Sequence, residues 1–80
     1  MKIDLKYQIK TGDGRQLASL ELRRATVGDL KAAQRVSDLA EEQEIALIAR
    51  LTGLLPEDVE LLDLADFRRL QDSFRAALEG

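Results

Sequence analysis

The sequence predicts an α+β fold in which an N-terminal β-hairpin packs against a cluster of three to four α-helices. Two observations lead to this class. Apolar and polar residues alternate with a period of two near the N-terminus, whereas apolar residues further along recur at helical spacing. The 80 residues suffice for one domain, and we expect residues 1–23 to form the hairpin and residues 26–79 the helical cluster.

The first strand and its turn are predicted by residues 2–14. Apolar side chains alternate with polar ones, which is typical of a strand with one buried face. The apolar positions are Ile3, Leu5, Tyr7 and Ile9. Gly12 and Gly14 can adopt the positive φ that a tight hairpin turn requires. A hairpin of this size is not stable alone in water, so its apolar face must pack on the helices.

The second strand, from about Arg15 to Leu22, has one irregularity. Ala18, Leu20 and Leu22 share a phase, whereas Leu17 is out of phase. This misfit indicates a bulge, or an irregular start of the strand near the turn.

The starts of two helices are marked by capping residues. Thr26, followed three residues later by Asp29, resembles a capping box and predicts Thr26 as the N-cap of the first helix. Ser37 or Asp38 is the expected cap of the second helix.

The second helix is predicted to lie at the centre of the fold. Residues 45–49 are all apolar, and a helix that is apolar almost all round is contacted on most sides. Gly53 is the expected left-handed residue at its C-terminal end. Pro56 then suits the first position of a short third helix that runs through Leu62.

The last helix has a strongly amphipathic pattern. Asp63 and Asp66 repeat the capping spacing at its start. An apolar stripe at helical spacing follows: Phe67, Leu70, Phe74, Ala77 and Leu78.

Composition excludes several classes of chemistry. The chain has no cysteine and no histidine, which removes disulfides, thiolate chemistry and histidine-based metal or acid–base sites. Carboxylates one helical turn apart, at Glu41 and Glu44 or at Asp63 and Asp66, are explained by solvation and capping at helix N-termini. We therefore expect no enzymatic activity, no metal and no cofactor.

Charge and hydropathy bear on the cellular location and the partner. No apolar run approaches the roughly 18 to 20 residues that span a bilayer, and the N-terminus lacks the apolar block of a signal peptide. We expect a cytoplasmic protein without a membrane partner.

Charge is distributed unevenly along the chain. Residues 1–35 carry eight basic and four acidic side chains, and residues 36–80 carry four basic and eleven acidic ones. These charges either form solvated faces or make a dipolar molecule that steers a partner or stacks head to tail.

The segment from Ile48 to Val59 allows two functional interpretations. Its helix, glycine turn and following helix have the spacing of a helix-turn-helix DNA reader. The second helix, however, begins Pro56-Glu57-Asp58-Val59-Glu60, and DNA binding relies on basic groups that neutralise phosphates. We favour a packing corner and expect no nucleic-acid partner. The alternative is a small helix-turn-helix-like regulator, which the basic residues of the hairpin would favour. A toxin–antitoxin or adaptor-like module is a third option.

Several motifs in a fixed order resemble a known family. The motifs are Arg24-Ala25-Thr26-Val27-Gly28-Asp29-Leu30, Ala49-Arg50-Leu51-Thr52-Gly53-Leu54, the segment Pro56–Leu62 and Leu64-Ala65-Asp66-Phe67-Arg68-Arg69-Leu70. Over residues 3–78 the chain resembles the small tail assembly chaperones of long-tailed bacteriophages, specifically the Mu-like tail protein E family of phages and prophages. Ala25 stands where that family usually has proline. The strongest matches are Thr26, Gly28, Asp29, Leu30, Leu51, Thr52, Gly53 and Asp66.

The resemblance implies a non-enzymatic assembly factor in the host bacterial cytoplasm. Such chaperones coat the long, largely helical tape measure protein before tube subunits polymerise around it, and they are absent from the mature virion. The implied partner is therefore the tape measure protein, with self-association as a further option.

The leucine-rich second half offers the apolar surface that such a role requires. The expected partner-binding residues are Leu54, Leu55, Leu61, Leu62 and Leu64. The alternative is that all of these leucines belong to the core.

Overall fold

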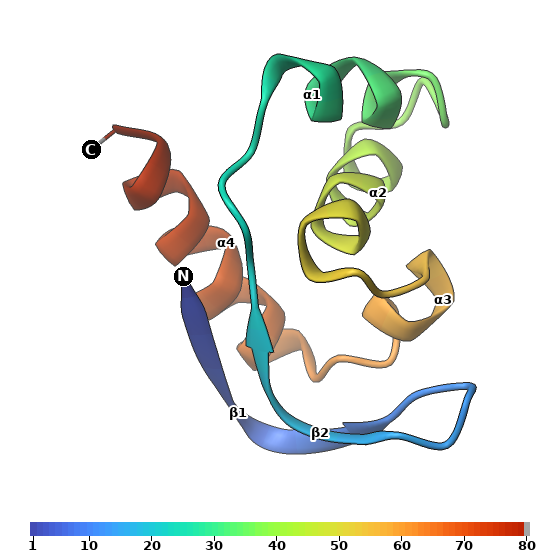
Figure 1. Cartoon of the computed structure of the whole chain (residues 1–80), viewed down its shortest axis with the longest axis vertical. Helices are drawn as coiled ribbons and strands as arrows, with labels where there is room; N and C mark the ends of the chain where they lie inside the picture. Colours follow the sequence, from blue (N-terminus) through green and yellow to red (C-terminus); the bar gives the residue numbers. More distant parts are fainter. Residues whose placement is uncertain (80) are drawn as a thin grey trace.

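Within residues 1–79, which the computed structural model describes, a two-stranded antiparallel hairpin is followed by four helices, and the predicted α+β class is confirmed. The elements are β1 (Lys2–Lys10), β2 (Gln16–Glu21), α1 (Val27–Gln34), α2 (Ala40–Thr52), α3 (Pro56–Val59) and α4 (Leu64–Glu79). In Figure 1 the curved hairpin lies at the bottom, α4 stands on the left, and α1, α2 and α3 lie on the right. The segment that joins β2 to α1 runs between these two groups of helices in this view.

A bulge in β1 explains the irregular phase of the hairpin. Ile9 pairs with Leu17, but the preceding paired residue of β1 is Asp4, whose partner is Ser19. Residues 5–8 of β1 therefore face a single residue of β2. Because directly paired residues point to the same side of the sheet, Leu17 lies on the side of the buried Ile9.

The bulge also corrects two positions in the predicted alternation. Tyr7 and Ala18 were expected on the buried face, yet both are exposed, Tyr7 by 52%. Inside a bulge the backbone leaves the regular pleat, so side chains there no longer follow a period of two.

The two predicted N-caps have different outcomes. The capping box is confirmed, because Thr26 Oγ1 accepts a hydrogen bond from the Asp29 backbone N–H and the Asp29 carboxylate accepts one from the Thr26 N–H. The N-cap of α2 is Leu39, so the prediction of Ser37 or Asp38 is wrong. Ser37 Oγ instead accepts a hydrogen bond from the Leu39 N–H at 3.0 Å, one step before the helix.

The core lies between the inner face of the hairpin and the helices. Ile48 on α2 and Leu70 on α4 are completely buried, which agrees with the predicted central position of α2. The apolar stripe of α4 enters the core only in part. Phe74 is buried, whereas Ala77 and Leu78 are exposed, so the last turn of α4 lies outside the core.

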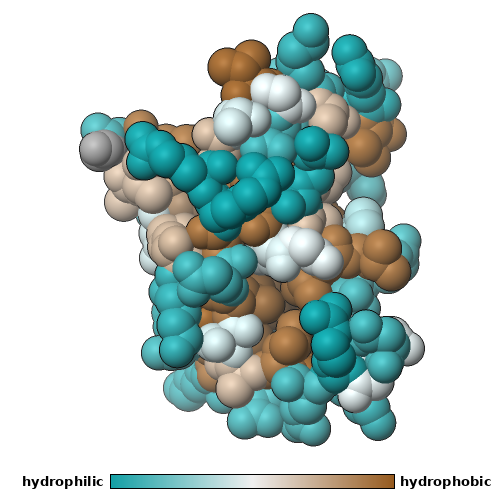
Figure 2. Space-filling view, in the orientation of Figure 1, coloured by the Kyte–Doolittle hydropathy of each residue, from teal (hydrophilic) through white to brown (hydrophobic). Residues whose placement is uncertain are grey.

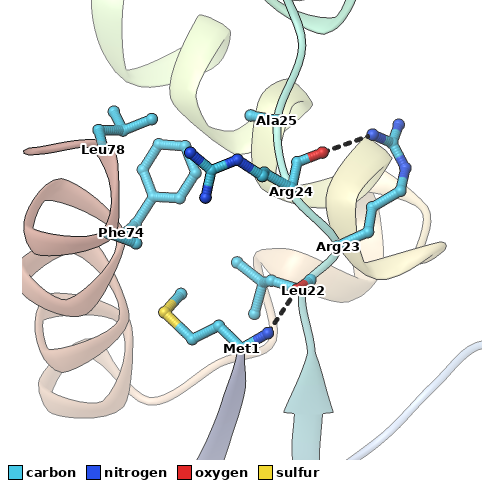
Figure 3. Close-up of a pocket in the computed structure, with 8 residues that line it drawn as sticks. Met1, Leu22, Arg23, Arg24, Ala25, Phe74 and Leu78 are labelled. Carbon is cyan, nitrogen blue, oxygen red and sulfur yellow. Dashed lines mark hydrogen bonds between the residues drawn. The ribbon is translucent and has the colours of Figure 1, made fainter. Parts of the chain in front are cut away.

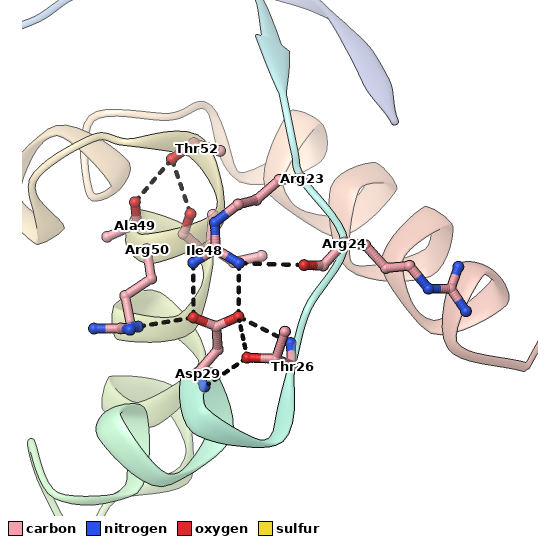
Figure 4. A network of polar contacts seen from close by, with 8 residues as sticks. All are labelled: Arg23, Arg24, Thr26, Asp29, Ile48, Ala49, Arg50 and Thr52. Atoms are coloured by element: carbon pink, nitrogen blue, oxygen red, sulfur yellow. Dashed lines mark hydrogen bonds and ion pairs between the residues drawn. The ribbon is translucent and has the colours of Figure 1, made fainter.

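A buried aspartate joins the end of the hairpin to α1 and α2. The Asp29 carboxylate on α1 accepts hydrogen bonds from Arg23, which follows β2, and from Arg50 on α2, at 2.7 and 3.1 Å (Figure 4). Hydrogen bonds from Arg23 and from the backbone N–H of Thr26 hold the pKa of Asp29 far below its ordinary value. Asp29 therefore stays ionised and keeps its partners in place.

Two further buried aspartates join the hairpin to α3 and α4. Asp58 Oδ1 on α3 accepts a hydrogen bond from the Gly12 N–H in the hairpin turn at 3.0 Å. The Asp66 carboxylate on α4 accepts hydrogen bonds from the backbone N–H groups of Lys6 and Tyr7 in the β1 bulge, at 3.1 and 3.0 Å. These contacts fix the orientation of α3 and α4 relative to the hairpin, and thereby the geometry of the segment between the two helices.

Candidate partner-binding surface

The connection between α2 and α4 is a tight corner. Gly53 ends α2 with a φ of 76°, in the left-handed region that glycine adopts without strain, and this prediction is confirmed. Leu55 is the N-cap of α3 and Pro56 its first residue. The helix ends at Val59, earlier than predicted, because residues 60 and 61 form a turn and residues 62 and 63 are not helical.

The five leucines predicted to bind a partner divide into two groups. Leu54 and Leu62 are buried members of the core, with 8% and 9% of their surface exposed. Their expected place on the partner-binding surface is corrected, because in this fold their side chains pack inward. Leu55, Leu61 and Leu64 are exposed by 61%, 53% and 62%. In each leucine pair of the corner, one side chain therefore enters the core and the other reaches solvent.

An open cavity of about 290 Å³ lies beside Leu64. It is bordered by α2, by the end of α3 and by the start of α4, and its lining is mostly apolar. The lining residues are Ile45, Val59, Glu60, Leu62, Leu64 and Phe67. We call this cavity, together with the exposed Leu55, Leu61 and Leu64, the corner surface. Figure 2 shows brown apolar groups at the right-hand edge of the molecule, beside α2 and α3, among teal polar ones.

Ile45 and Phe67 were not predicted as members of this site. Phe67 was assigned to the core stripe of α4, yet it is only partly buried and lies one helical turn after Leu64. The spacing of three residues between Leu64 and Phe67 could have indicated that Phe67 belongs to the same surface. Ile45 comes from a different helix, so only the tertiary fold places it at the cavity.

The corner carries an excess of negative charge. Residues 51–67 contain five acidic side chains and no lysine or arginine. Asp58 and Asp66 are buried and serve the hairpin contacts described above. Glu57 and Glu60 are exposed and Asp63 is half-buried, and within residues 1–79 none of these three forms an ion pair.

Two other cavities lie at the opposite end of α4. One, of about 170 Å³, lies between the start of the chain, the segment after β2 and the end of α4 (Figure 3). In that view the Arg24 side chain extends toward Phe74 and Leu78. The other, of about 270 Å³, lies between α1, α2 and α4. The sequence indicated neither cavity.

The corner does not have the geometry of a DNA-reading helix-turn-helix. The helix that would enter the groove, α3, has only four residues. Its Asp58 is turned toward the hairpin, and its exposed Glu57 would face the phosphates. In the described part of the chain, no group of three or more acidic, histidine or cysteine side chains is placed to hold a metal ion. No helix within residues 1–79 is long and apolar enough to cross a membrane.

Comparison with known protein families gives a match that covers nearly the whole chain. Residues 2–79 match the family described as phage tail assembly chaperone proteins, E, or 41 or 14. No curated protein and no solved structure gives a significant match.

Proposed function

Because this chain belongs to the family of phage tail assembly chaperone proteins, we propose that it binds and shields the helical tape measure protein during tail assembly. The role is one of binding without catalysis, carried out in the host bacterial cytoplasm by a factor that does not remain in the mature virion. The corner surface is the proposed contact with the partner.

One observation carries this proposal. Leu55, Leu61 and Leu64 lie within ten residues of one another, and each exposes more than half of its surface. Large exposed apolar side chains concentrated in one short segment of a small protein are typical of a protein–protein contact. A tape measure protein that is not yet enclosed by its tube exposes apolar helical stripes, and the corner surface would cover one of them.

The test is co-purification. The chain is co-expressed with a candidate tape measure protein from a neighbouring reading frame, and the amount retained on an affinity-tagged chain is measured. Replacing Leu55, Leu61 and Leu64 together with serine should reduce the retained tape measure protein about tenfold or more, since buried leucines at an interface each contribute roughly 1 kcal/mol or more. Thermal melts establish that the variant is folded.

Leu39→Ser is the matched control. Leu39 is exposed by 57% and does not line the cavity, and serine suits its N-cap position at the start of α2. It should retain the tape measure protein as the parent chain does. Equal retention by the triple variant and the parent would place the contact elsewhere, and absence of any retention by the parent would reject the proposed partner.

A further inference from the structure

The edge of the corner surface is acidic on two sides. Glu60 lines the cavity itself, and Glu57 and Asp63 lie three residues to either side of it. On the opposite side, Glu41 and Glu42 lie one helical turn before the cavity-lining Ile45, so they occupy the neighbouring surface of α2.

The basic residues nearest in sequence do not balance these acids. Arg50 bonds to Asp29 through its Nε at 3.1 Å, and Arg69 bonds to Asp66, so both cations are committed to buried carboxylates. Arg68, one turn after Leu64 on α4, is exposed at the same edge. Counted over these sequence neighbours, one uncommitted cation against five carboxylates gives the edge of the corner surface a net negative charge.

The elements around the cavity also restrict the conformation of what can bind there. Its lining residues come from α2 and from the segment between α3 and α4, and none comes from a strand. An extended partner would find no strand edge to pair with, and its backbone N–H and C=O groups would lose hydrogen bonds on docking. A helix satisfies its own backbone and presents only side chains.

From these observations we infer that the segment held by the corner surface is an amphipathic α-helix whose apolar stripe is flanked by lysine or arginine. This inference rests on the proposed function, and it defines which part of the partner is recognised. The apolar stripe contacts Leu55, Leu61 and Leu64 and places a side chain in the cavity. The flanking cations face Glu57, Glu60 and the acids of α2.

The experiment uses the full chain and two synthetic helical peptides of about 20 residues. Both peptides have the same leucine stripe, but the positions flanking it are lysine in one and glutamate in the other. Binding is measured by fluorescence anisotropy at low and at high salt. We expect the lysine-flanked peptide to bind about tenfold more tightly at low salt, which corresponds to ~1.4 kcal/mol, and the difference to shrink at high salt.

A charge-changed chain tests whether the preference arises at the corner surface. Glu57→Lys, Glu60→Lys and Asp63→Asn are combined, with asparagine chosen because the Asp63 carboxylate accepts the Ala65 N–H at 3.0 Å at the start of α4. This variant should lose or reverse the preference. A control chain with Asp72→Lys, Glu79→Lys and Asp4→Asn has the same net charge, because each set removes three acids and adds two lysines, and it should keep the preference.

Three outcomes would overturn the inference. The first is equal binding of the two peptides by the parent chain. The second is an equal loss of the preference in the variant and in the control chain. The third is self-association of the chain, seen by sedimentation, that the Glu57, Glu60 and Asp63 changes abolish, since a second copy would then occupy the corner surface.

The peptide experiment and the co-purification experiment can fail separately. Leucine-dependent retention of the tape measure protein without any peptide preference would leave the proposed function standing and reject the basic-flanked helix. A lysine preference without retention of the tape measure protein would support the helix chemistry and reject the proposed partner.

Discussion

The Asp66 carboxylate on α4 accepts a hydrogen bond from the backbone N–H of Tyr7, 59 residues earlier, at 3.0 Å. A second bond from the Lys6 N–H completes the contact. One buried side chain thus pairs two backbone donors that the bulge would otherwise leave unpaired. The irregular strand and the last helix are therefore interdependent. The corner surface, which includes the segment between α3 and α4, depends on that attachment.

The first prediction concerns this contact. Asp66→Asn replaces one acceptor oxygen with an NH₂ group that faces other donors, including the Arg69 guanidinium. We expect the melting temperature to fall by roughly 10 °C, because buried donors would lose their partner. Asp72→Asn, an exposed change on the same helix, is the control and should leave the melting temperature within about 2 °C of the parent. A similar melt for both variants would contradict the proposed role of the bulge contact.

The second prediction is a loss of stability in acid. Arginine hydrogen bonds lower the pKa values of Asp29 and Asp66 below their ordinary value of 3.8, with Arg23 and Arg69 as the largest causes. A carboxyl group with a lowered folded pKa stabilises the fold above its unfolded pKa, and this contribution is lost as the pH falls. Urea denaturation should therefore show a nearly constant stability from pH 7 to about pH 5 and a decline below about pH 4.

A variant that removes the two titrating groups checks the cause of that decline. The combined Asp29→Asn and Asp66→Asn chain, if it folds at pH 7, should show a shallower decline in acid than the parent. If it does not fold, Asp29→Asn alone should still make the decline shallower, by less than the combined change. An unchanged slope would assign the acid sensitivity to other carboxylates.

The third prediction concerns the turn between α2 and α3. Gly53 has a φ of 76°, and no atom lies within 4 Å of the place where a Cβ would be. Gly53→Val should therefore destabilise the fold through backbone strain, without a steric clash, by more than ~1 kcal/mol. Gly28→Ala in α1 is the control, since its Cβ would meet Thr26 Oγ1 at an ordinary 3.6 Å and alanine favours helix. Chemical denaturation should show a loss for the first variant and none for the second.

Local signals in the sequence predicted local structure well. The Thr26–Asp29 capping box, the Gly53 C-cap and the hairpin turn each depend on residues within a few positions of one another. The bulge was indicated by Leu17, but its place in β1 was not. That place depends on Asp66, whose contact with Tyr7 spans most of the chain, and no periodicity in either segment encodes it.

The division of the proposed partner-binding leucines could not be predicted, for a related reason. Leu54 and Leu62 are core residues, whereas Leu55 and Leu61 are exposed. Neighbouring leucines in short turns have no helical or strand period, so the sequence does not say which member of each pair points inward. It depends on how α3 packs in the folded chain, where the hydrogen bond from the Gly12 N–H to Asp58 joins α3 to the hairpin.

The fourth prediction tests the two sides of one leucine pair. Leu62→Glu places a carboxylate in the core, where the side chain it replaces is 9% exposed, and should destabilise the fold by about 3 kcal/mol or more. Leu61→Glu puts the same charge on a side chain that is 53% exposed, and should change the stability by less than about 0.5 kcal/mol. Urea denaturation of the two variants, which carry the same substitution at neighbouring positions, measures the difference in their stability directly.

If Leu61→Glu also weakens retention of the tape measure protein while Leu39→Ser does not, the outward side chain of Leu61 acts in binding and the inward side chain of Leu62 in folding. Equal destabilisation by both glutamates would instead mean that Leu61 is buried in solution, and the corner surface would lose one of its three exposed leucines.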